Sequence, residues 1–473
     1  MADEQWLKSN IVFGSAGMAA SGMLPQPPVK PRPKPKPQPV EEVIAPPVVD
    51  KEEVEVEEEE EVVVAEEIVE EVEEVPFEPV QPVGYGINSK AQGLFTDLTV
   101  GIIGNGNRKV DGCDWDYVFR DIPGLIVEGI SDPDEASLED LQEVYSFDGG
   151  YSDYRELLAR TRPNLVAIPQ YGTKNRYEMI KNCLMSGSHV ICPGPFTRSL
   201  VEADELIALA DRRGLKIAVS YPMRLDPNIV RFFEMREELI GDLVELRIYG
   251  DMDEKSGGED LLVRGGPFFD LVRMFAGDVL WGTATIWTDG ERSTREDIVD
   301  NPDSPWGPLI GDTINAQFFT TNDVLTTFVS NAKLQNVTNG WAMEFIGSKS
   351  VMKVLGGDRP TLSLLQNPGE KSAQVAENWM QWPEHRNPYH PPVDHLEGAE
   401  AANRLTVADW LEAISQDRQP ESSGRRAMKV LEMVHGVFQA AMSGRRVYFP
   451  PANRHHPLTP EVKPYEMEYR ESA

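Results

Sequence analysis

The sequence predicts an α/β protein in which a disordered tail precedes a doubly wound parallel sheet and an α+β domain with an open, largely antiparallel sheet. Three observations lead to this prediction. From about Gly93, short apolar runs alternate with stretches of helical spacing. Beyond about Tyr221 the strands become longer and alternate with polar residues, as in a sheet packed through one face. The first 93 residues have too few apolar positions for a core.

The predicted tail, residues 1–93, has two biased segments. Pro25–Pro39 carries proline at alternate positions, which favours a stiff polyproline II spacer. Lys51–Val75 contains 14 glutamates that repel one another, so we expect it to be disordered. The alternative is an interaction tail, whose Val and Ile side chains dock on a protein partner with a basic surface.

Composition excludes several classes of protein. The formal net charge of −33, with no basic patch in the folded part, makes a nucleic-acid partner unexpected. Cys113, Cys183 and Cys192 have no CxxC spacing, so we expect neither a disulfide framework nor a thiolate zinc site, and a cytoplasmic location fits. Residues 11–25 are too short and too rich in Gly, Ala and Ser to span a membrane, while a role in export stays open.

The first folded domain is expected over residues 94–220. Its predicted strands are Leu98–Ile103, Leu125–Ser131, Asn164–Pro169, His189–Cys192 and Lys216–Ser220. Its predicted helices are Tyr154–Thr161, Asn175–Ser186 and Ser199–Arg213.

The second domain is expected over residues 221–458, with a short tail at 459–473. Its predicted strands are Leu243–Tyr249, Val279–Trp287, Thr313–Thr320 and Val324–Ser330. Two amphipathic helices, Leu405–Gln416 and Gly424–Met442, close it.

A nucleotide site is predicted where the first strand ends. The strand runs directly into Gly104, Asn105 and Gly106, and glycine at two of these positions allows a tight turn and a close approach of backbone amides to a pyrophosphate. We predict cofactor contacts from these three residues and from Asn107 and Arg108. Lys109 stands where the third glycine of a GxGxxG motif would be, so a bare turn is the alternative.

Asp132 supports the nucleotide interpretation. It follows the second strand, 28 residues after Gly104, where a carboxylate accepts hydrogen bonds from the adenosine ribose of a dinucleotide. The same charge repels a 2′-phosphate, so NAD is expected rather than NADP. The alternative for Asp132-Pro133-Asp134 is a plain turn or helix cap. Strand, glycines and acid together predict a Rossmann domain.

A chain of motifs extends this prediction to a family. GIIGNGN, SDPDEA, SDYRELL, LMSGSHVICPGP, MRLDPNI and DLVRMFAGD occur in the order and near the spacing of the Gfo/Idh/MocA oxidoreductases, which the sequence resembles over about Leu98–Leu458. The resemblance implies an NAD(P) cofactor that is also contacted at Pro195, a sugar-like ligand in a cleft between the domains, and a homo-oligomer formed through the open sheet.

The family's catalytic residues are substituted. The catalytic lysine of the Glu-Lys-Pro triplet aligns with Gly194, and the aspartate and histidine of the Asp-x-Gly-x-His motif align with Val263 and Pro267. Glycine can neither donate a proton nor stabilise an alkoxide. The resemblance therefore implies a diverged or non-catalytic member with no assignable catalytic residue. The alternative is an active oxidoreductase with a rearranged site.

Three residues are weighed as substitutes, namely Arg224, Arg264 and Tyr221, although such arginines are more often surface ion-pair partners. An NAD-assisted lyase or glycosidase, which some relatives with this fold are, would need the same missing residues. His390 with His395, and His455 with His456, are expected to be loop or tail residues, so no metal site is predicted.

Overall fold

The computed structural model describes residues 98–104, 118–119, 122, 124–147, 150–170, 172–251, 258–301, 304–334, 340–356, 360–365, 379–382 and 399–459. The predicted N-terminal tail and nearly all of the predicted C-terminal tail lie outside these ranges, and so do Cys113, His390 and His395. Among the described residues, no helix is both long and apolar enough to cross a membrane.

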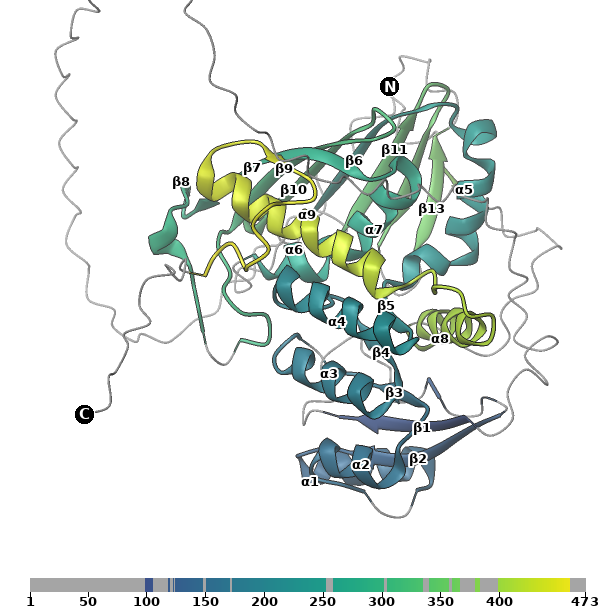
Figure 1. Cartoon of the computed structure of the whole chain (residues 1–473). Coiled ribbons are helices and arrows are strands. Elements are labelled where there is room, and N and C mark those ends of the chain that lie inside the picture. Colours follow the sequence, from purple (N-terminus) through teal and green to yellow (C-terminus); the bar gives the residue numbers. More distant parts are fainter. Residues whose placement is uncertain are drawn as a thin grey trace, which may run out of the picture. The chain divides into compact units, whose positions relative to one another are not determined.

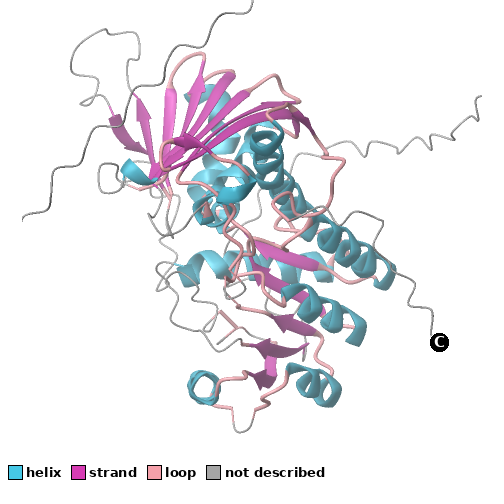
Figure 2. Cartoon of the chain, turned by 90° about the vertical axis from the view of Figure 1, so that its left-hand side faces the viewer, coloured by secondary structure: helices cyan, strands magenta, loops and turns pink. Residues whose placement is uncertain are grey.

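The first sheet is parallel and has five strands in the order β2-β1-β3-β4-β5 (Figures 1 and 2). Helices cover both faces of a doubly wound parallel sheet, so the strands are buried and their sequences are apolar. They are β1 (Leu98–Ile103), β2 (Leu125–Ser131), β3 (Leu165–Ala167), β4 (His189–Pro193) and β5 (Ile217–Ser220). The helices are α1 (Glu135–Tyr145), α2 (Tyr154–Thr161), α3 (Arg176–Ser186) and α4 (Leu200–Arg213). The predicted doubly wound parallel sheet is confirmed.

The second sheet has ten strands and is largely antiparallel, as predicted. Its order is β14-β13-β12-β11-β6-β10-β9-β7-β15, with β8 paired to β7. The strands are β6 (Leu243–Asp251), β7 (Val279–Thr288), β8 (Glu291–Arg292), β9 (Thr313–Thr320), β10 (Leu325–Asn331), β11 (Ala342–Gly347), β12 (Val351–Leu355), β13 (Thr361–Leu365), β14 (Trp379–Trp382) and β15 (Val447–Tyr448). Its parallel pair, β6 with β10, lies near the middle of the sheet.

Helices join the two sheets and cover one face of the second (Figure 1). A short 3-10 helix, η1 (Pro222–Leu225), leads from β5 into α5 (Pro227–Leu239). Further on lie α6 (Glu259–Val263) and α7 (Gly265–Ala276). Two more 3-10 helices, η2 (Arg295–Asp297) and η3 (Ala332–Leu334), lie between strands of the second sheet.

The last two helices return to the first sheet. In α8 (Ala399–Ser415), Trp410 is fully buried and belongs to the same apolar cluster as Val100 of β1 and Ile191 of β4. Helix α9 (Gly424–Ser443) packs on α4 and on β7. Just before α9, Ser423 forms an isolated antiparallel bridge with Ala218 of β5. The end of the chain therefore completes the core of the parallel sheet.

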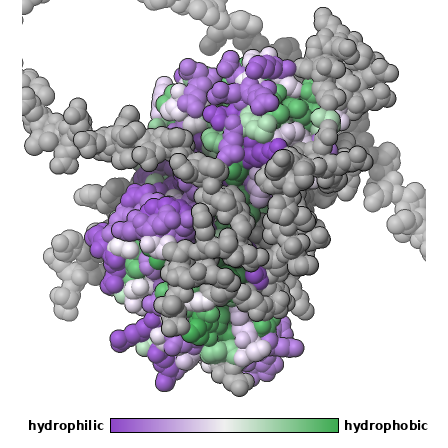
Figure 3. Space-filling model, turned by 90° about the vertical axis from the view of Figure 1, so that its right-hand side faces the viewer, coloured by the Kyte–Doolittle hydropathy of each residue, from purple (hydrophilic) through white to green (hydrophobic). Residues whose placement is uncertain are grey.

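The described surface is not uniform in polarity. On the face seen in Figure 3, hydrophilic residues dominate the upper part, at the second sheet, and hydrophobic residues gather at the lower end, at the first. Ile126 of the edge strand β2 is half exposed. An apolar side chain on an edge strand is a place where another surface can pack.

Candidate functional site

The turn after β1 is built against the end of β2. The amide of Gly104 donates a hydrogen bond to the carbonyl of Ser131 (2.7 Å). A Cβ atom added to Gly104 would collide with the Asp132 carboxylate. Glycine is therefore required here because the acid at the end of the neighbouring strand fills the space of a side chain.

Asp132 itself is 1% exposed. One carboxylate oxygen accepts the amide of Asp134 (2.9 Å), and the Asp132 amide donates to the carbonyl of Tyr151 (3.0 Å). A buried carboxylate at the carboxyl end of a parallel strand is where a Rossmann domain binds the adenosine ribose. The residues present at this edge thus fit a dinucleotide.

The helix cap that the sequence offered as the alternative belongs to Asp134. Its carboxylate accepts the backbone amide (2.9 Å) and the hydroxyl (2.8 Å) of Ser137 at the start of α1. These bonds, the backbone one first, lower the pKa of Asp134. Two acids, two residues apart, therefore share the end of β2, one capping the helix and the other facing Gly104.

The other predicted cofactor residues of the glycine turn, Asn105, Gly106, Asn107 and Arg108, lie outside the described residues. Pro195 is described and buried, in the turn between β4 and α4. Their contacts with a cofactor stay predictions. The structure brings Gly104 and Asp132 together at one edge of the sheet.

A buried arginine supports the turn in which the family carries its lysine. Arg176, at the start of α3, is fully buried. Its guanidinium donates to the carbonyl of Pro193 (2.8 Å) and to the carbonyls of Pro195 and Gln170. Carbonyl oxygens thus surround its charge, and the arginine fixes the backbone on both sides of Gly194.

A segment of the second domain covers the turn before α3. The carbonyl of Pro305 accepts the amides of Thr173 (2.8 Å) and Lys174 (3.1 Å), and Arg198 donates to the carbonyl of Ser304 (3.1 Å). These residues lie more than a hundred positions apart in the chain. No sequence motif predicts these hydrogen bonds, because their acceptors are main-chain carbonyls, which every residue has.

The positions aligned with the family's second motif lie where α6 meets α7. Val263 ends α6, whereas Gly265 and Pro267 lie in the first turn of α7. Proline is tolerated there because first-turn amides have no partner within the helix. The first turn of α7 therefore offers no acidic or imidazole side chain at these positions.

The three proposed substitutes have different environments. Arg264 is exposed at the start of α7, and Tyr221 is buried at the end of β5. Arg224 is buried in a bidentate ion pair with Asp270, with Nε–Oδ2 at 2.7 Å and Nη2–Oδ1 at 3.0 Å. Burial lowers the pKa of Arg224, but the charge and hydrogen bond of Asp270, together with the charges of Glu421 and Asp409, outweigh burial and raise the pKa. Arg224 is therefore a structural cation rather than a surface one.

Histidines in the described residues form no metal site. His456 is buried and packs edge-on against the fully buried His435, with ring centroids 5.0 Å apart. Its neighbour His455 is exposed. Within the described ranges, no group of three or more His, Cys, Asp or Glu side chains is placed to hold a metal ion.

Comparison with known proteins matches this architecture. Residues 98–221 match the family model described as "Oxidoreductase family, NAD-binding Rossmann fold". D-apiose dehydrogenase of Paraburkholderia graminis is 20% identical over 347 residues, which cover 70% of this chain and 85% of that protein.

Solved structures share the fold. An oxidoreductase domain protein from Kribbella flavida superposes with a TM-score of 0.61 at 19% identity, covering 75% of this chain and 100% of that one. Levoglucosan dehydrogenase, solved in complex with NADH and levoglucosan, superposes with a TM-score of 0.60 at 16% identity over the same shares.

Proposed function

Because this chain belongs to the Gfo/Idh/MocA oxidoreductase family through its residues 98–221, we propose that it binds NAD and that its chemistry has diverged from the family's alcohol oxidation. The observation that carries the proposal is the contact between Gly104 and Asp132. The glycine leaves room for the carboxylate, and the buried carboxylate stands where an adenosine ribose is bound.

The expected cofactor is NAD rather than NADP. The Asp132 carboxylate can accept hydrogen bonds from the two ribose hydroxyls, but it would repel a 2′-phosphate. Asn105, Gly106, Asn107 and Arg108 would provide amides for the pyrophosphate, and Pro195 would lie beside the cofactor. When bound, NAD supplies a hydride acceptor.

Divergence is proposed because three positions lack the side chains that the family uses. Gly194, Val263 and Pro267 can neither move a proton nor stabilise an oxyanion through their side chains. General acid–base help contributes roughly 10² to 10⁴ in rate, so its loss greatly slows ordinary alcohol oxidation. The chain is therefore proposed to be a binding or scaffold protein that retains the dinucleotide pocket.

Calorimetry of NAD+ and NADH with the full chain tests the binding. We expect saturable binding that is lost when Gly104 and Gly106 are both replaced by valine, because a side chain at 104 displaces Asp132. Circular dichroism of the variant checks that the fold persists. Failure of the unmodified chain to bind either nucleotide would refute the proposal.

A turnover assay tests the divergence. D-apiose and levoglucosan are suitable substrates because they are named for relatives of this chain, and NADH absorbance follows the reaction. We expect NAD binding without appreciable oxidation of either sugar. Rapid turnover would instead support the second candidate function, a working oxidoreductase on a sugar-like substrate.

The second candidate depends on Tyr221. Arg224 is committed to Asp270, and Arg264 is exposed, which leaves Tyr221 as the buried polar side chain beside Gly194. If the chain is active, Tyr221→Phe should abolish turnover while Arg264→Gln leaves it unchanged. A partner of the Glu-rich segment 51–75, a homo-oligomer and a cytoplasmic location stay predictions.

A further inference from the structure

Tyr221 and Gly194 follow the ends of neighbouring parallel strands. In the register of β4 with β5, Pro193 lies opposite Ser220, and the Gly194 amide donates to the Ser220 carbonyl (3.1 Å). Ligands of doubly wound sheets bind at the carboxyl ends of the strands. Both residues are therefore at the edge of the sheet that receives the cofactor.

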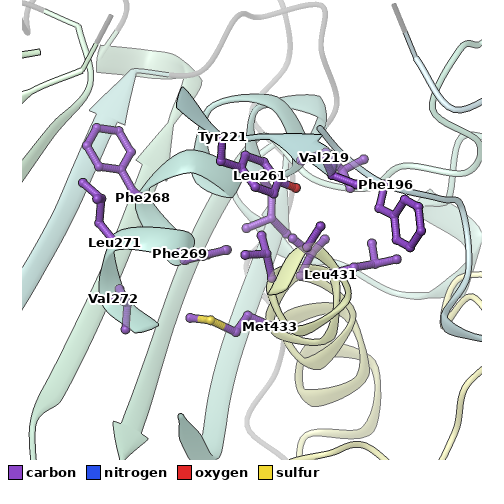
Figure 4. Packing of buried hydrophobic residues seen from close by; sticks show 14 of the residues in the cluster. Phe196, Val219, Tyr221, Leu261, Phe268, Phe269, Leu271, Val272, Leu431 and Met433 are labelled. Atoms are coloured by element: carbon purple, nitrogen blue, oxygen red, sulfur yellow. The ribbon is translucent and has the colours of Figure 1, made fainter. Parts of the chain in front are cut away.

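Two glycines make room for the Tyr221 ring. A Cβ atom added to Gly194 would collide with the ring and lie 2.9 Å from the hydroxyl oxygen, and one added to Gly266 would lie 3.0 Å from ring carbon Cε1. Tyr221 belongs to the same buried apolar cluster as Val219 of β5 and Leu261 of α6, which are labelled with it in Figure 4. The ring thus fills the space in which a side chain at position 194 would begin.

The hydroxyl of Tyr221 has no hydrogen-bond partner among the described residues, although the residue is 4% exposed. Leaving a buried donor without a partner is unfavourable, so a ligand oxygen that accepts from it would be bound more tightly. Burial first, and the charge of Asp270 second, raise the pKa of Tyr221 above its usual range. The group is therefore a neutral donor and not a base.

The position of Tyr221 in the sheet indicates which part of the ligand it meets. Asp132 ends β2, and the order β2-β1-β3-β4-β5 puts β4 three strands away. At about 4.8 Å between strands, the two ends are roughly 14 Å apart. A dinucleotide whose adenosine lies at Asp132 would extend across this edge toward β4, so its nicotinamide end faces Gly194 and Tyr221.

We propose that the Tyr221 hydroxyl donates a hydrogen bond to a neutral oxygen of the ligand, carbonyl or hydroxyl, at the nicotinamide end of the site. Gly194 leaves the space that the ring occupies, and Gly266 avoids a tight contact with the ring. The inference rests on the proposed binding of NAD. The oxygen belongs either to the nicotinamide carboxamide or to a sugar-like second ligand, and the ligands used in the test separate these sources.

Tyr221→Phe in the full chain tests the hydrogen bond, with NADH, with ADP-ribose and with levoglucosan in the presence of saturating NADH as ligands. We expect unchanged affinity for ADP-ribose, which lacks nicotinamide. Affinity for NADH lowered about three- to tenfold assigns the bond to the carboxamide. Unchanged affinity for NADH with weaker levoglucosan binding assigns it to the second ligand.

If neither affinity falls, the inference is wrong even though NAD binding stands. If the unmodified chain does not bind NADH, the proposed function fails and the inference fails with it. The two failures are therefore distinguishable by the behaviour of the unmodified protein.

Stability gives a second readout and a matched control. Without ligand, Tyr221→Phe should melt no lower than the unmodified chain, because it removes a buried donor that has no partner. Tyr154→Phe should melt lower, since the Tyr154 hydroxyl accepts a hydrogen bond from Asn182 (2.9 Å), and its NADH affinity should not change. A Tyr221→Phe variant that melts as low as Tyr154→Phe would show a hydroxyl already bonded within the protein.

The packing of glycine and tyrosine is tested separately. Gly194→Ala should lower the melting temperature in the unmodified chain and have little effect in a Tyr221→Ala background, because the colliding ring is then absent. Equal effects in both backgrounds would contradict the steric part of the proposal.

Discussion

At the scale of single residues, Asp132 is the side chain on which the proposed preference for NAD over NADP depends. Replacing it with alanine removes the acceptor of the ribose hydroxyls, and hydrogen bonds to a charged group contribute about 1.5–3 kcal/mol. We expect NADH affinity to fall about tenfold or more, while NADPH binding improves relative to NADH. Calorimetry with both nucleotides measures this. Asp153→Ala, which removes an equal charge at the start of α2, should leave both affinities unchanged.

The Arg224–Asp270 ion pair is expected to contribute to the stability of the fold rather than to a reaction. Asp270→Asn removes the bidentate counter-charge of the buried Arg224 guanidinium and leaves Glu421, with Nη1–Oε2 at 3.7 Å, as its remaining ion-pair partner; breaking a buried pair typically costs about 3–5 kcal/mol. Urea unfolding should show a loss of this size. Glu156→Gln breaks the exposed pair with Arg160 and should cost less than about 1 kcal/mol. Similar losses in the two variants would mean that Arg224 finds another partner.

At the residue scale, the sequence allowed the proximity of Gly104 and Asp132 to be predicted from a local motif, while their role in cofactor binding stays a prediction. Gly104 and Asp132 follow consecutive strands of a recognisable pattern, and the structure brings them into contact. The relation between Gly194 and Tyr221 was not predictable, because it depends on β4 and β5 being neighbours and on which way a ring turns. Arg176 was missed because its hydrogen bonds to the carbonyls of Pro193, Pro195 and Gln170 involve main-chain atoms, which leave no residue spacing to detect.

At the scale of elements, buried strands were the most predictable. The apolar strands β1, β2 and β9 have the predicted bounds, because continuous or alternating apolar runs determine them. Helices α1 and α7 were not predicted. The first is mostly polar on its surface, and the second begins with two glycines and a proline, so tertiary packing rather than local propensity defines both. Strands β11, β13 and β14 were missed as well.

Helix α8 is predicted to be essential to the parallel sheet. Trp410 is fully buried, so Trp410→Ala should cost about 3–5 kcal/mol in urea unfolding. Trp410→Phe should cost less, because the indole N–H has no partner among the described residues. Gln416→Ala, just beyond the exposed end of the helix, should change stability by less than about 0.5 kcal/mol. A Trp410→Ala chain as stable as the unmodified one would indicate that α8 packs elsewhere.

At the scale of the whole molecule, stability should fall in mild acid. Burial, and then the charge of Arg198, lower the pKa of His456 to about 4, and burial and then His456 lower the pKa of His435 well below its usual value. The unfolded chain therefore binds more protons between pH 6.5 and 4. Stability present above pH 6.5 is lost toward pH 4, and for His456 the loss between pH 7 and 5 is about 2 kcal/mol.

Melting temperatures measured over this range check the effect. His456→Gln should flatten the curve, whereas His455→Gln, which alters the exposed neighbour, should not. Parallel curves for the unmodified chain and His456→Gln would exclude the histidine pair as the cause. Carboxylates titrate in the same pH range and affect both variants alike. The effect of His456 is therefore the difference between the melting-temperature curves of His456→Gln and His455→Gln.

The return of the chain end to the first sheet has a consequence for biosynthesis. A nascent polypeptide that has left the ribosome as far as Tyr221 already contains the five parallel strands, but it lacks Trp410 of α8 and the bridge from Ser423 to Ala218. Arg454, which pairs with Asp204 of α4, is made later still. The packing of the parallel sheet is therefore complete only after α8, Ser423 and Arg454 have been synthesised.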